Sequence, residues 1–153
     1  MRTRMATLAD REEIIALTFL SKAHWGYDAA FMERVREELK VPVKHIEAGY
    51  GHVLEDDAGN MSGFFSLIET NHGWELDFFF LHPMYIGKGL GRSLWEAVIE
   101  QARHVGIESF AIVADPHAEG FYRRMGAERI GEVRSSSVKN RMLPLLRAEV
   151  PQE

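Results

Sequence analysis

A run of closely spaced glycines is the feature of this sequence with the clearest chemical potential. Residues 74–81 form a nearly continuous apolar stretch of strand length, which Pro83 closes. Glycine then takes every second position from 87 to 91, with Lys88 and Arg92 beside it, and an amphipathic helical pattern follows at once. Glycine lets backbone N–H groups approach a phosphate, and a helix N-terminus adds about +0.5 charge. A strand, a glycine loop and a helix start in this order predict an anion-binding site.

Two common nucleotide-binding loops do not fit this spacing. A Walker loop needs Gly-Lys followed by Ser or Thr, whereas Lys88 is followed by Gly89. A dinucleotide-binding loop needs a small residue where Arg92 stands, and its acidic ribose partner should close the next strand, whereas Glu108 opens it. Two interpretations stay open: a phosphate-binding loop of another kind, or a tight connection that uses glycine only for its φ angles.

Length, composition and charge set further limits. The chain has 153 residues, 46% of them hydrophobic, and we expect one domain over residues 1–150 with a short tail at 151–153. Its net charge of −5 argues against general nucleic-acid binding. The lack of cysteine excludes a thiolate nucleophile or zinc site, and the histidines show no metal-ligand spacing, so we expect no metal. No signal peptide or spanning stretch is evident, and we expect a cytoplasmic protein.

Hydrophobic periodicity predicts an α+β fold. Helices are expected at 10–21, from 28 onward, at 89–104 and at 116–125, with a short helical turn at 42–48. Strands are expected at 2–7, 52–55, 62–69, 74–81, 108–114, 127–133 and 142–148. Turn-forming residues at 56–60 and 71–73 connect the strands on either side into an antiparallel meander. The sequence thus predicts a central mixed, mostly antiparallel sheet flanked by about four helices.

A second segment, after the expected strand at 108–114, resembles a known family. The segment Ala-x-x-Phe-Tyr-x-x-x-Gly-Phe/Ala is typical of the GNAT superfamily, the Gcn5-related N-acetyltransferases. It is matched here by Ala118, Phe121, Tyr122, Gly126 and Ala127.

The glycine loop carries the other half of this resemblance. GNAT proteins have an apolar-x-Pro strand end followed by the loop Gln/Arg-x-x-Gly-x-Gly/Ala. Here Leu81-His82-Pro83 and the loop from Ile86 to Gly91 stand in those places. The order and number of predicted elements match too, so the resemblance covers nearly the whole chain and implies the GNAT-like acyl-CoA N-acyltransferase fold.

The resemblance implies acetyl transfer from acetyl-CoA to an amine. The resemblance implies that the cofactor's diphosphate binds at the glycine loop and the helix start. It implies that the pantetheine amides pair with the end of the central strand. There a backbone N–H near Phe80 or Leu81 would donate to the thioester oxygen. The cofactor-binding residues it implies are Phe79, Phe80, Leu81, Ile86, Gly87, Lys88, Gly89, Leu90, Gly91 and Arg92. Ile86 stands where the family usually has Gln or Arg, so one polar side-chain contact to the cofactor should be missing.

An acid and a base are also needed. Tyr122 holds the family's position for protonating the leaving thiolate; the alternative is a Tyr that only packs its helix onto the sheet. The amine must lose a proton, and Glu75 and Asp77 alternate along the central strand, on one face. Charges on an apolar strand are costly unless they are paired or line a solvated cleft, so either carboxylate is our base candidate. His24 is the other candidate for the base. Alternatively, Glu75 and Asp77 have no catalytic role and are strand-end charges that bond to a neighbouring loop.

The acceptor site is expected at the aromatic loop after the first helix. In the GNAT superfamily the first two helices form the acceptor wall, so Lys22, His24, Trp25 and Tyr27 should line the cleft, although Trp25 could equally cap the core. The sequence does not specify the acceptor, a small-molecule or peptide amine, and the negative charge only slightly favours a cationic one. We expect no nucleic-acid or membrane partner, and homodimers are common among such proteins. The alternative function is a non-catalytic CoA-binding sensor or interaction module, which Ile86 favours and an intact Tyr122 disfavours.

Overall fold

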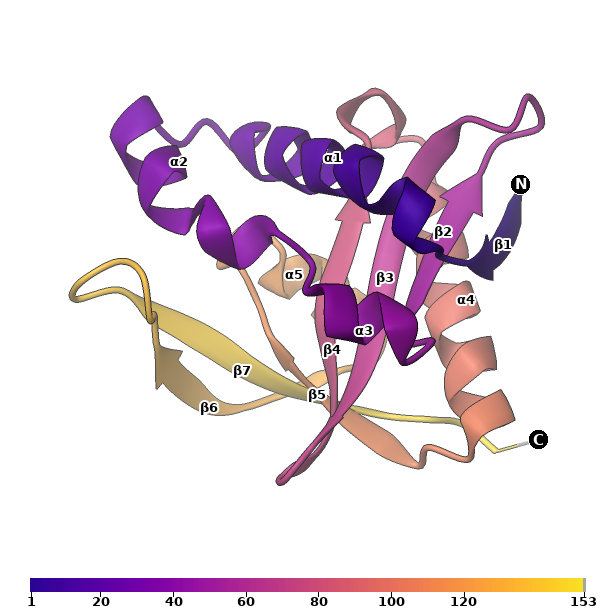
Figure 1. The fold of residues 1–153 in the computed structure, drawn as a ribbon. Coiled ribbons are helices and arrows are strands. Elements are labelled where there is room, and N and C mark those ends of the chain that lie inside the picture. The colour runs from indigo at the N-terminus through magenta and orange to yellow at the C-terminus, as the bar shows by residue number, and fades with distance from the viewer. Residues whose placement is uncertain (153) are drawn as a thin grey trace.

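A seven-stranded sheet forms the centre of the molecule in the computed structural model, which describes residues 1–152 (Figure 1). The strand order is β1-β2-β3-β4-β5-β7-β6, and every neighbouring pair is antiparallel except β4 and β5, which are parallel. The strands are β1 (Arg2–Met5), β2 (Gly51–Glu55), β3 (Met61–Thr70), β4 (Gly73–Leu81), β5 (Ser109–Val113), β6 (Glu128–Arg134) and β7 (Met142–Glu149). The predicted mixed, mostly antiparallel sheet is confirmed.

Five α-helices accompany the sheet. They are α1 (Arg11–Ala23), α2 (Ala29–Val35), α3 (Val43–Glu47), α4 (Leu90–Val105) and α5 (Glu119–Arg124). The count exceeds the expected four because the helical turn predicted at 42–48 is the short helix α3. Pro116 does not open α5, since Asp115 first forms a turn: its carbonyl accepts from the Ala118 N–H. Within residues 1–152 no helix is long and apolar enough to cross a membrane, and residue 153 of the predicted tail lies outside the described residues.

Two helical layers cover the two faces of the sheet. Leu94 and Val98 of α4 are fully buried in one core, together with Phe110 of β5. Ile14 of α1 and Ile46 of α3 are buried in the other core, against the opposite face. Each such side chain contributes about 1.5–3 kcal/mol by leaving water. The helical stripes expected from the sequence therefore face the sheet from both sides.

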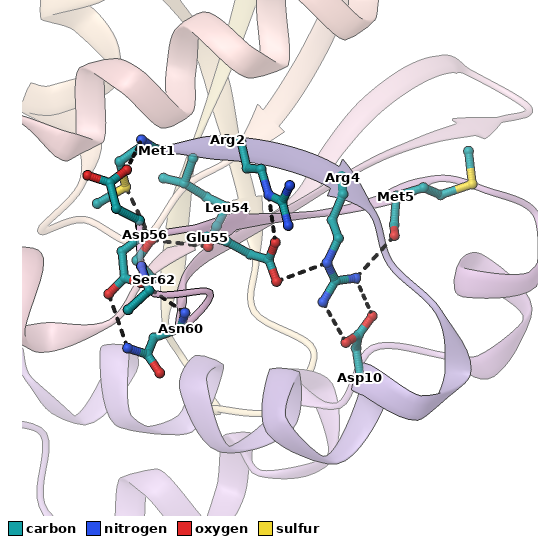
Figure 2. A network of polar contacts seen from close by, with 12 residues as sticks. Met1, Arg2, Arg4, Met5, Asp10, Leu54, Glu55, Asp56, Asn60 and Ser62 are labelled. Carbon is teal, nitrogen blue, oxygen red and sulfur yellow. Dashed lines mark hydrogen bonds and ion pairs between the residues drawn. The ribbon is translucent and has the colours of Figure 1, made fainter.

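An ionic network fixes the start of α1 on the sheet (Figure 2). Arg4 of β1 donates to both carboxylate oxygens of Asp10 at 2.8 and 2.9 Å, and its Nε lies 3.1 Å from Glu55 of β2. The hydrogen bonds from Arg4 are the main cause of the low pKa of Asp10, about 2. Because this contact joins β1, β2 and the entry to α1, it holds α1 over the sheet.

The centre of the sheet is irregular in two places. Phe78 pairs with Ser66 and Leu76 with Leu67, so Asp77 is an extra residue in β4, a β-bulge. A bulge bends its strand and shifts the faces of the residues that follow. Leu76 accordingly packs in the core beneath α4, whereas Phe78, two positions later, packs in the core beneath α1.

The second irregularity separates β4 from β5. Although the two strands are neighbours, their only paired residues within the described chain are Glu75 and Ala111. Beyond this point the strands diverge, and Figure 1 shows them running apart, with α5 visible between them and α1 and α2 above them in this view. The predicted central strand is therefore open on one side over the half that leads to the glycine loop.

Candidate active site

A cavity of about 840 Å³ lies where β4 and β5 diverge. Its walls come from the end of α1, the second half of β4, the loop before α4, the segment from β5 into α5, and the β6–β7 hairpin. A volume of this size is in the range of sites that hold a cofactor or a drug-sized ligand. Elements far apart in the sequence thus meet around one hollow.

The open edge of β4 forms one wall of this cavity. Phe79, Phe80 and Leu81 all line it. On its other edge this stretch pairs with β3, but towards β5 it has no strand partner among the described residues. Backbone N–H and C=O groups on such an edge can bind an extended chain of amides as an added strand.

The glycine loop closes one end of the cavity. Gly87 and Gly89 have φ angles of +82° and +80°, which favour glycine, and α4 begins directly after Gly89 with no side chain capping it. The first N–H groups of this helix therefore have no intrahelical acceptor and can bind an anion. At Gly91 the reason for glycine is contact: a Cβ there would lie 2.9 Å from the ring of Phe121 on α5.

Most of the predicted cofactor-binding residues meet at this wall. The cavity is lined by Phe79, Phe80, Leu81, Ile86, Gly87, Gly89, Gly91 and Arg92. Lys88 and Leu90 do not line it; the side chain of Lys88 is exposed. The loop thus offers mainly backbone groups and one guanidinium to a ligand in the cavity.

Tyr122 reaches the same cavity from α5. Its ring packs against Phe79 and Trp95, with centroids 5.6 and 6.0 Å apart, and only 6% of the residue is exposed. The hydroxyl makes no hydrogen bond to any residue from 1 to 152. Burial is the main cause of a raised pKa of Tyr122, and the negative charge of Asp115 adds to it. The hydroxyl therefore stays protonated at neutral pH and is free to donate to a bound group.

Glu75 and Asp77 both line the cavity from the side opposite α5, near the point where β4 and β5 part. Burial raises the pKa of Glu75. Burial also raises the pKa of Asp77 from 3.8 to about 7; the charge of Glu75 adds to this shift and the Ser66 hydroxyl opposes it. A carboxyl group with such a pKa can accept and release a proton near neutral pH.

Only some residues at the end of α1 and in the aromatic loop after it line the cavity. Lys22 and Trp25 line the cavity, and Trp25 stacks on the His117 ring with centroids 5.2 Å apart. His24 and Tyr27 do not line it. His24 meets Trp25 edge-on, and the Tyr27 hydroxyl donates to Asp115 at 2.8 Å.

Asp115, at the end of β5, holds a buried ionic cluster together. Its carboxylate accepts from Lys22 of α1 and from Tyr27, and Arg141 Nη2 lies 3.5 Å from the same carboxylate and 2.7 Å from the Tyr27 oxygen. Burial alone would raise the pKa of Asp115, but the Lys22 charge and these hydrogen bonds outweigh it and lower the pKa. The cluster ties the end of α1 to the segment that follows β5 and to the residue that precedes β7, beside the cavity.

Sequence reasoning did not identify this cluster. One signal was available: a charged residue directly after a buried parallel strand lies at the strand end where ligands usually bind. Nothing in the local sequence marks Arg141, which is 26 positions from Asp115 and 119 from Lys22.

Replacing Asp115 by Ala should lower the free energy of unfolding by about 3 kcal/mol, because Lys22 and Arg141 would be left as buried, unpaired cations. Chemical denaturation followed by tryptophan fluorescence measures this. Asp57→Ala is the matched control: its side chain is 99% exposed and its ion pair with the N-terminus should contribute less than about 0.5 kcal/mol. Equal stability of both variants would mean that the cluster does not hold α1 to the sheet.

A family model decides the wider assignment. The model described as the acetyltransferase (GNAT) family matches residues 15–127, which include most of α1, the glycine loop and α5. This chain belongs to the GNAT family. The family resemblance predicted from the two motifs is confirmed.

Curated relatives of this GNAT protein include plant and algal acetyltransferases. It is 24% identical over 98 residues to the uncharacterized N-acetyltransferase ycf52 of Porphyra purpurea, a match that covers 63% of this chain and 56% of that protein. It is 29% identical over 104 residues to the chloroplastic serotonin N-acetyltransferase 2 of Oryza sativa subsp. japonica, covering 63% of this chain and 49% of that protein. The chain thus spans about half the length of these relatives.

Solved structures confirm the GNAT fold. The PaiA N-acetyltransferase of Thermoplasma acidophilum, crystallised with coenzyme A, matches with a TM-score of 0.77 at 17% identity over 97% of this chain and 98% of that one. The acetyltransferase yncA of Salmonella typhimurium, crystallised with acetyl-CoA, gives a TM-score of 0.69 at 20% identity over 100% and 95%. At such identities the likeness concerns the fold.

Proposed function

We propose that this GNAT protein transfers the acetyl group of acetyl-CoA to the primary amine of a small molecule or peptide by direct attack of the amine. The observation that carries the proposal is the cavity between β4 and β5, because it combines three features that this reaction needs. One wall is a strand edge without a partner among the described residues, one end is a helix N-terminus without a side-chain cap, and beside the strand edge lies a tyrosine whose hydroxyl has no hydrogen bond within residues 1–152.

The first two features suit the two ends of acetyl-CoA. Its diphosphate is an anion, which the N–H groups at the start of α4 and the Arg92 guanidinium can hold. Its pantetheine arm carries amides, which the open edge of β4 over Phe79–Leu81 can bind as an added strand. PaiA and yncA, named above, were crystallised with coenzyme A and acetyl-CoA, which supports the same class of ligand here. Ile86 lines the cavity but offers no polar group, so the backbone must supply the contact that its side chain cannot make.

The remaining groups suit the chemistry. In our proposal Asp77, with Glu75 beside it, accepts the proton of the attacking amine, and a backbone N–H near Phe80 or Leu81 stabilises the oxyanion. Tyr122 donates its proton to the leaving thiolate and regains one from water when coenzyme A leaves; burial keeps this phenol protonated at neutral pH between turnovers. Lys22 and Trp25 form the part of the wall where the acceptor would lie. No group of three or more His, Asp or Glu side chains suited to a metal ion gathers within residues 1–152, and the proposal uses none.

Gly89→Glu should weaken acetyl-CoA binding at least about 100-fold, or roughly 3 kcal/mol, because the new carboxylate would lie where the diphosphate binds. Gly59→Glu is the matched control. Gly59 lies in the β2–β3 turn, away from the cavity, has a φ of +85° and, like Gly89, has open space around a new Cβ. Both variants should lose similar stability from the strained φ, but only Gly89→Glu should lose binding in a calorimetric titration. Intact binding by Gly89→Glu would place the diphosphate elsewhere.

A transfer assay tests the proposed activity. Because the chain contains no cysteine, a thiol-reactive chromophore reports only the CoA thiol that is released. The purified protein is incubated with acetyl-CoA and a panel of aryl-alkyl amines, polyamines, amino acids and peptides, and mass spectrometry identifies the N-acetyl product. Amine-dependent thiol release with a matching product supports the transferase. Coenzyme A binding without any turnover would favour the non-catalytic CoA-binding module, to which the apolar Ile86 gives some weight.

A further inference from the structure

His45 of α3 lies directly behind Asp77 as seen from the cavity. Asp77 lines the cavity and His45 does not, yet His45 Nδ1 is 3.4 Å from Asp77 Oδ2. Both side chains are largely buried, with 16% and 13% exposed. Asp77 Oδ1 and His45 Nδ1 are among the buried polar atoms of residues 1–152 that have no hydrogen-bond partner. Buried polar atoms usually find partners, so an open pair beside a cavity points to a role.

The other ring nitrogen of His45 faces outward. No hydrogen bond joins Nε2 to any residue from 1 to 152, and Nε2 is not among the buried unpartnered atoms, so it is in contact with solvent. The ring therefore has one nitrogen at a buried carboxyl group and the other at water. Imidazole can take a proton at one nitrogen and release another from the second nitrogen.

We propose that His45 carries the proton of the acceptor amine from Asp77 out to solvent through the α3 side of the sheet. This inference rests on the proposed function and adds a residue to it. An amine that binds in its neutral form passes one proton to Asp77 per turnover, and the side of Asp77 that faces the cavity would be covered by the bound substrates. A route past α3 lets the proton reach solvent while both substrates still fill the cavity.

The proton count balances along this route. The Asp77 carboxylate takes a proton from the amine nitrogen as the C–N bond forms and becomes a neutral carboxyl group. His45, in the tautomer that carries hydrogen on Nε2, accepts that proton at Nδ1 and releases the Nε2 proton to water. Asp77 is then a carboxylate again, and a flip of the imidazole ring restores the starting tautomer.

The electrostatic surroundings suit a transfer between these two groups. Burial lowers the pKa of His45, and the neighbouring charge of Lys44 lowers it further. Burial raises the pKa of Asp77 to about 7, with Glu75 adding and Ser66 opposing. Tyr50 meets the His45 ring edge-on, with the ring centroids 6.2 Å apart. The two shifts therefore reverse the usual order of proton affinity, so that the imidazole gives up a proton to water more readily than the carboxyl group does.

The test uses His45→Ala and its rescue by imidazole. We expect kcat of His45→Ala to fall about 100-fold, the lower end of proton-transfer contributions, with the KM for acetyl-CoA unchanged. Added imidazole should restore kcat in proportion to its concentration, which a merely structural role would not produce. His72→Ala, at an exposed histidine in the β3–β4 turn, is the control and should keep full activity without any response to imidazole.

An NMR titration provides a second readout that needs no turnover. In the wild type the His45 ring signals should show a step near pH 7, because Asp77 and His45 titrate as a pair. That step should be absent in Asp77→Asn.

Each result decides one point. Full activity of His45→Ala, a loss that imidazole does not restore, or His45 signals that ignore Asp77→Asn would overturn the relay. Failure of the proposed function looks different, because then the wild type itself releases no thiol with any amine.

Discussion

Asp77→Asn should lower kcat for amine acetylation by about 10²–10⁴-fold while making the protein more stable. The loss follows from the proposed role of Asp77 as the proton acceptor, since positioned general bases contribute factors of this size. An amide of the same shape can still line the cavity but cannot take the proton. Acetyl-CoA binding, which we assign to the open edge of β4 over Phe79–Leu81 and to the glycine loop, should stay within about twofold of the wild type.

The gain in stability follows from the pKa of Asp77. Burial raises this pKa from 3.8 to about 7, so the folded protein holds a proton that the unfolded chain releases. Ionisation of Asp77 therefore destabilises the folded protein. The free energy of unfolding of the wild type falls as pH rises from about 4 to about 7 and then levels off. Asn does not ionise, so Asp77→Asn escapes this loss. We expect a gain of about 2 kcal/mol at pH 8, which is less than the full shift implies at roughly 1.4 kcal/mol per pKa unit, and about a quarter of that gain at pH 4.5.

Denaturation curves of wild type and Asp77→Asn at the two pH values measure this difference, and steady-state assays measure kcat. Asp56→Asn is the control: this exposed carboxylate in the β2–β3 turn has a lowered pKa, with the Asn60 N–H as the main cause. Its replacement should cost stability at pH 8 and leave kcat unchanged. An Asp77→Asn variant that is active, or less stable than wild type at pH 8, would contradict our assignment of Asp77.

Tyr122→Phe should lower kcat by about 10²–10³-fold with little change in acetyl-CoA affinity or stability. The ring packs against Phe79 and Trp95, and Phe keeps that packing. The hydroxyl has no hydrogen-bond partner within residues 1–152, so its removal breaks no bond in the free protein. Only the proton donated to the leaving thiolate is lost. This combination separates an acid from a residue that merely packs α5 onto the sheet.

Tyr50→Phe is the matched control for Tyr122→Phe, because Tyr50 is half-buried, away from the cavity, and carries no hydrogen bond from its hydroxyl in the described residues. Its activity should equal that of the wild type. An acetyl donor whose leaving thiol has a lower pKa than coenzyme A, such as an acetylated aryl thiol, should partly restore the turnover of Tyr122→Phe. Its thiolate is a better leaving group and needs less protonation. Unchanged turnover of Tyr122→Phe with acetyl-CoA would show that another group protonates the thiolate.

Much of the fold was predictable because local pattern and tertiary position agree. The apolar run at 74–81 is β4, the α4 stripe through Leu94 and Val98 is fully buried, and the glycine loop starts α4 after Gly89 as expected. The start of α5 was less predictable, because Asp115 uses its backbone and side chain in a turn that delays the helix to Glu119. Family motifs predicted a cofactor loop and a catalytic role for Tyr122, since each motif depends on residues close together in the chain; both assignments stay predictions.

The features that depend on distant contacts were not predictable. The bulge at Asp77 arises from its register against Ser66 and Leu67, which no pattern within β4 reveals. His45 lies 32 positions before Asp77, and nothing in the sequence of α3 marks it as a neighbour of a buried carboxyl group. The same holds for the cluster around Asp115, whose members come from parts of the sequence that lie far apart.

The measurement that tests the central claim most directly is a calorimetric titration of the purified wild-type protein with acetyl-CoA, coenzyme A and ATP. If the diverging β4 and β5 hold pantetheine and the start of α4 holds the diphosphate, acetyl-CoA and coenzyme A should both bind with one-to-one stoichiometry. ATP, which has phosphates but no pantetheine arm, should bind at least about 100-fold more weakly. Equal binding of all three ligands would mean that the site recognises only phosphate groups. No binding of acetyl-CoA would contradict the proposed acetyl-CoA site.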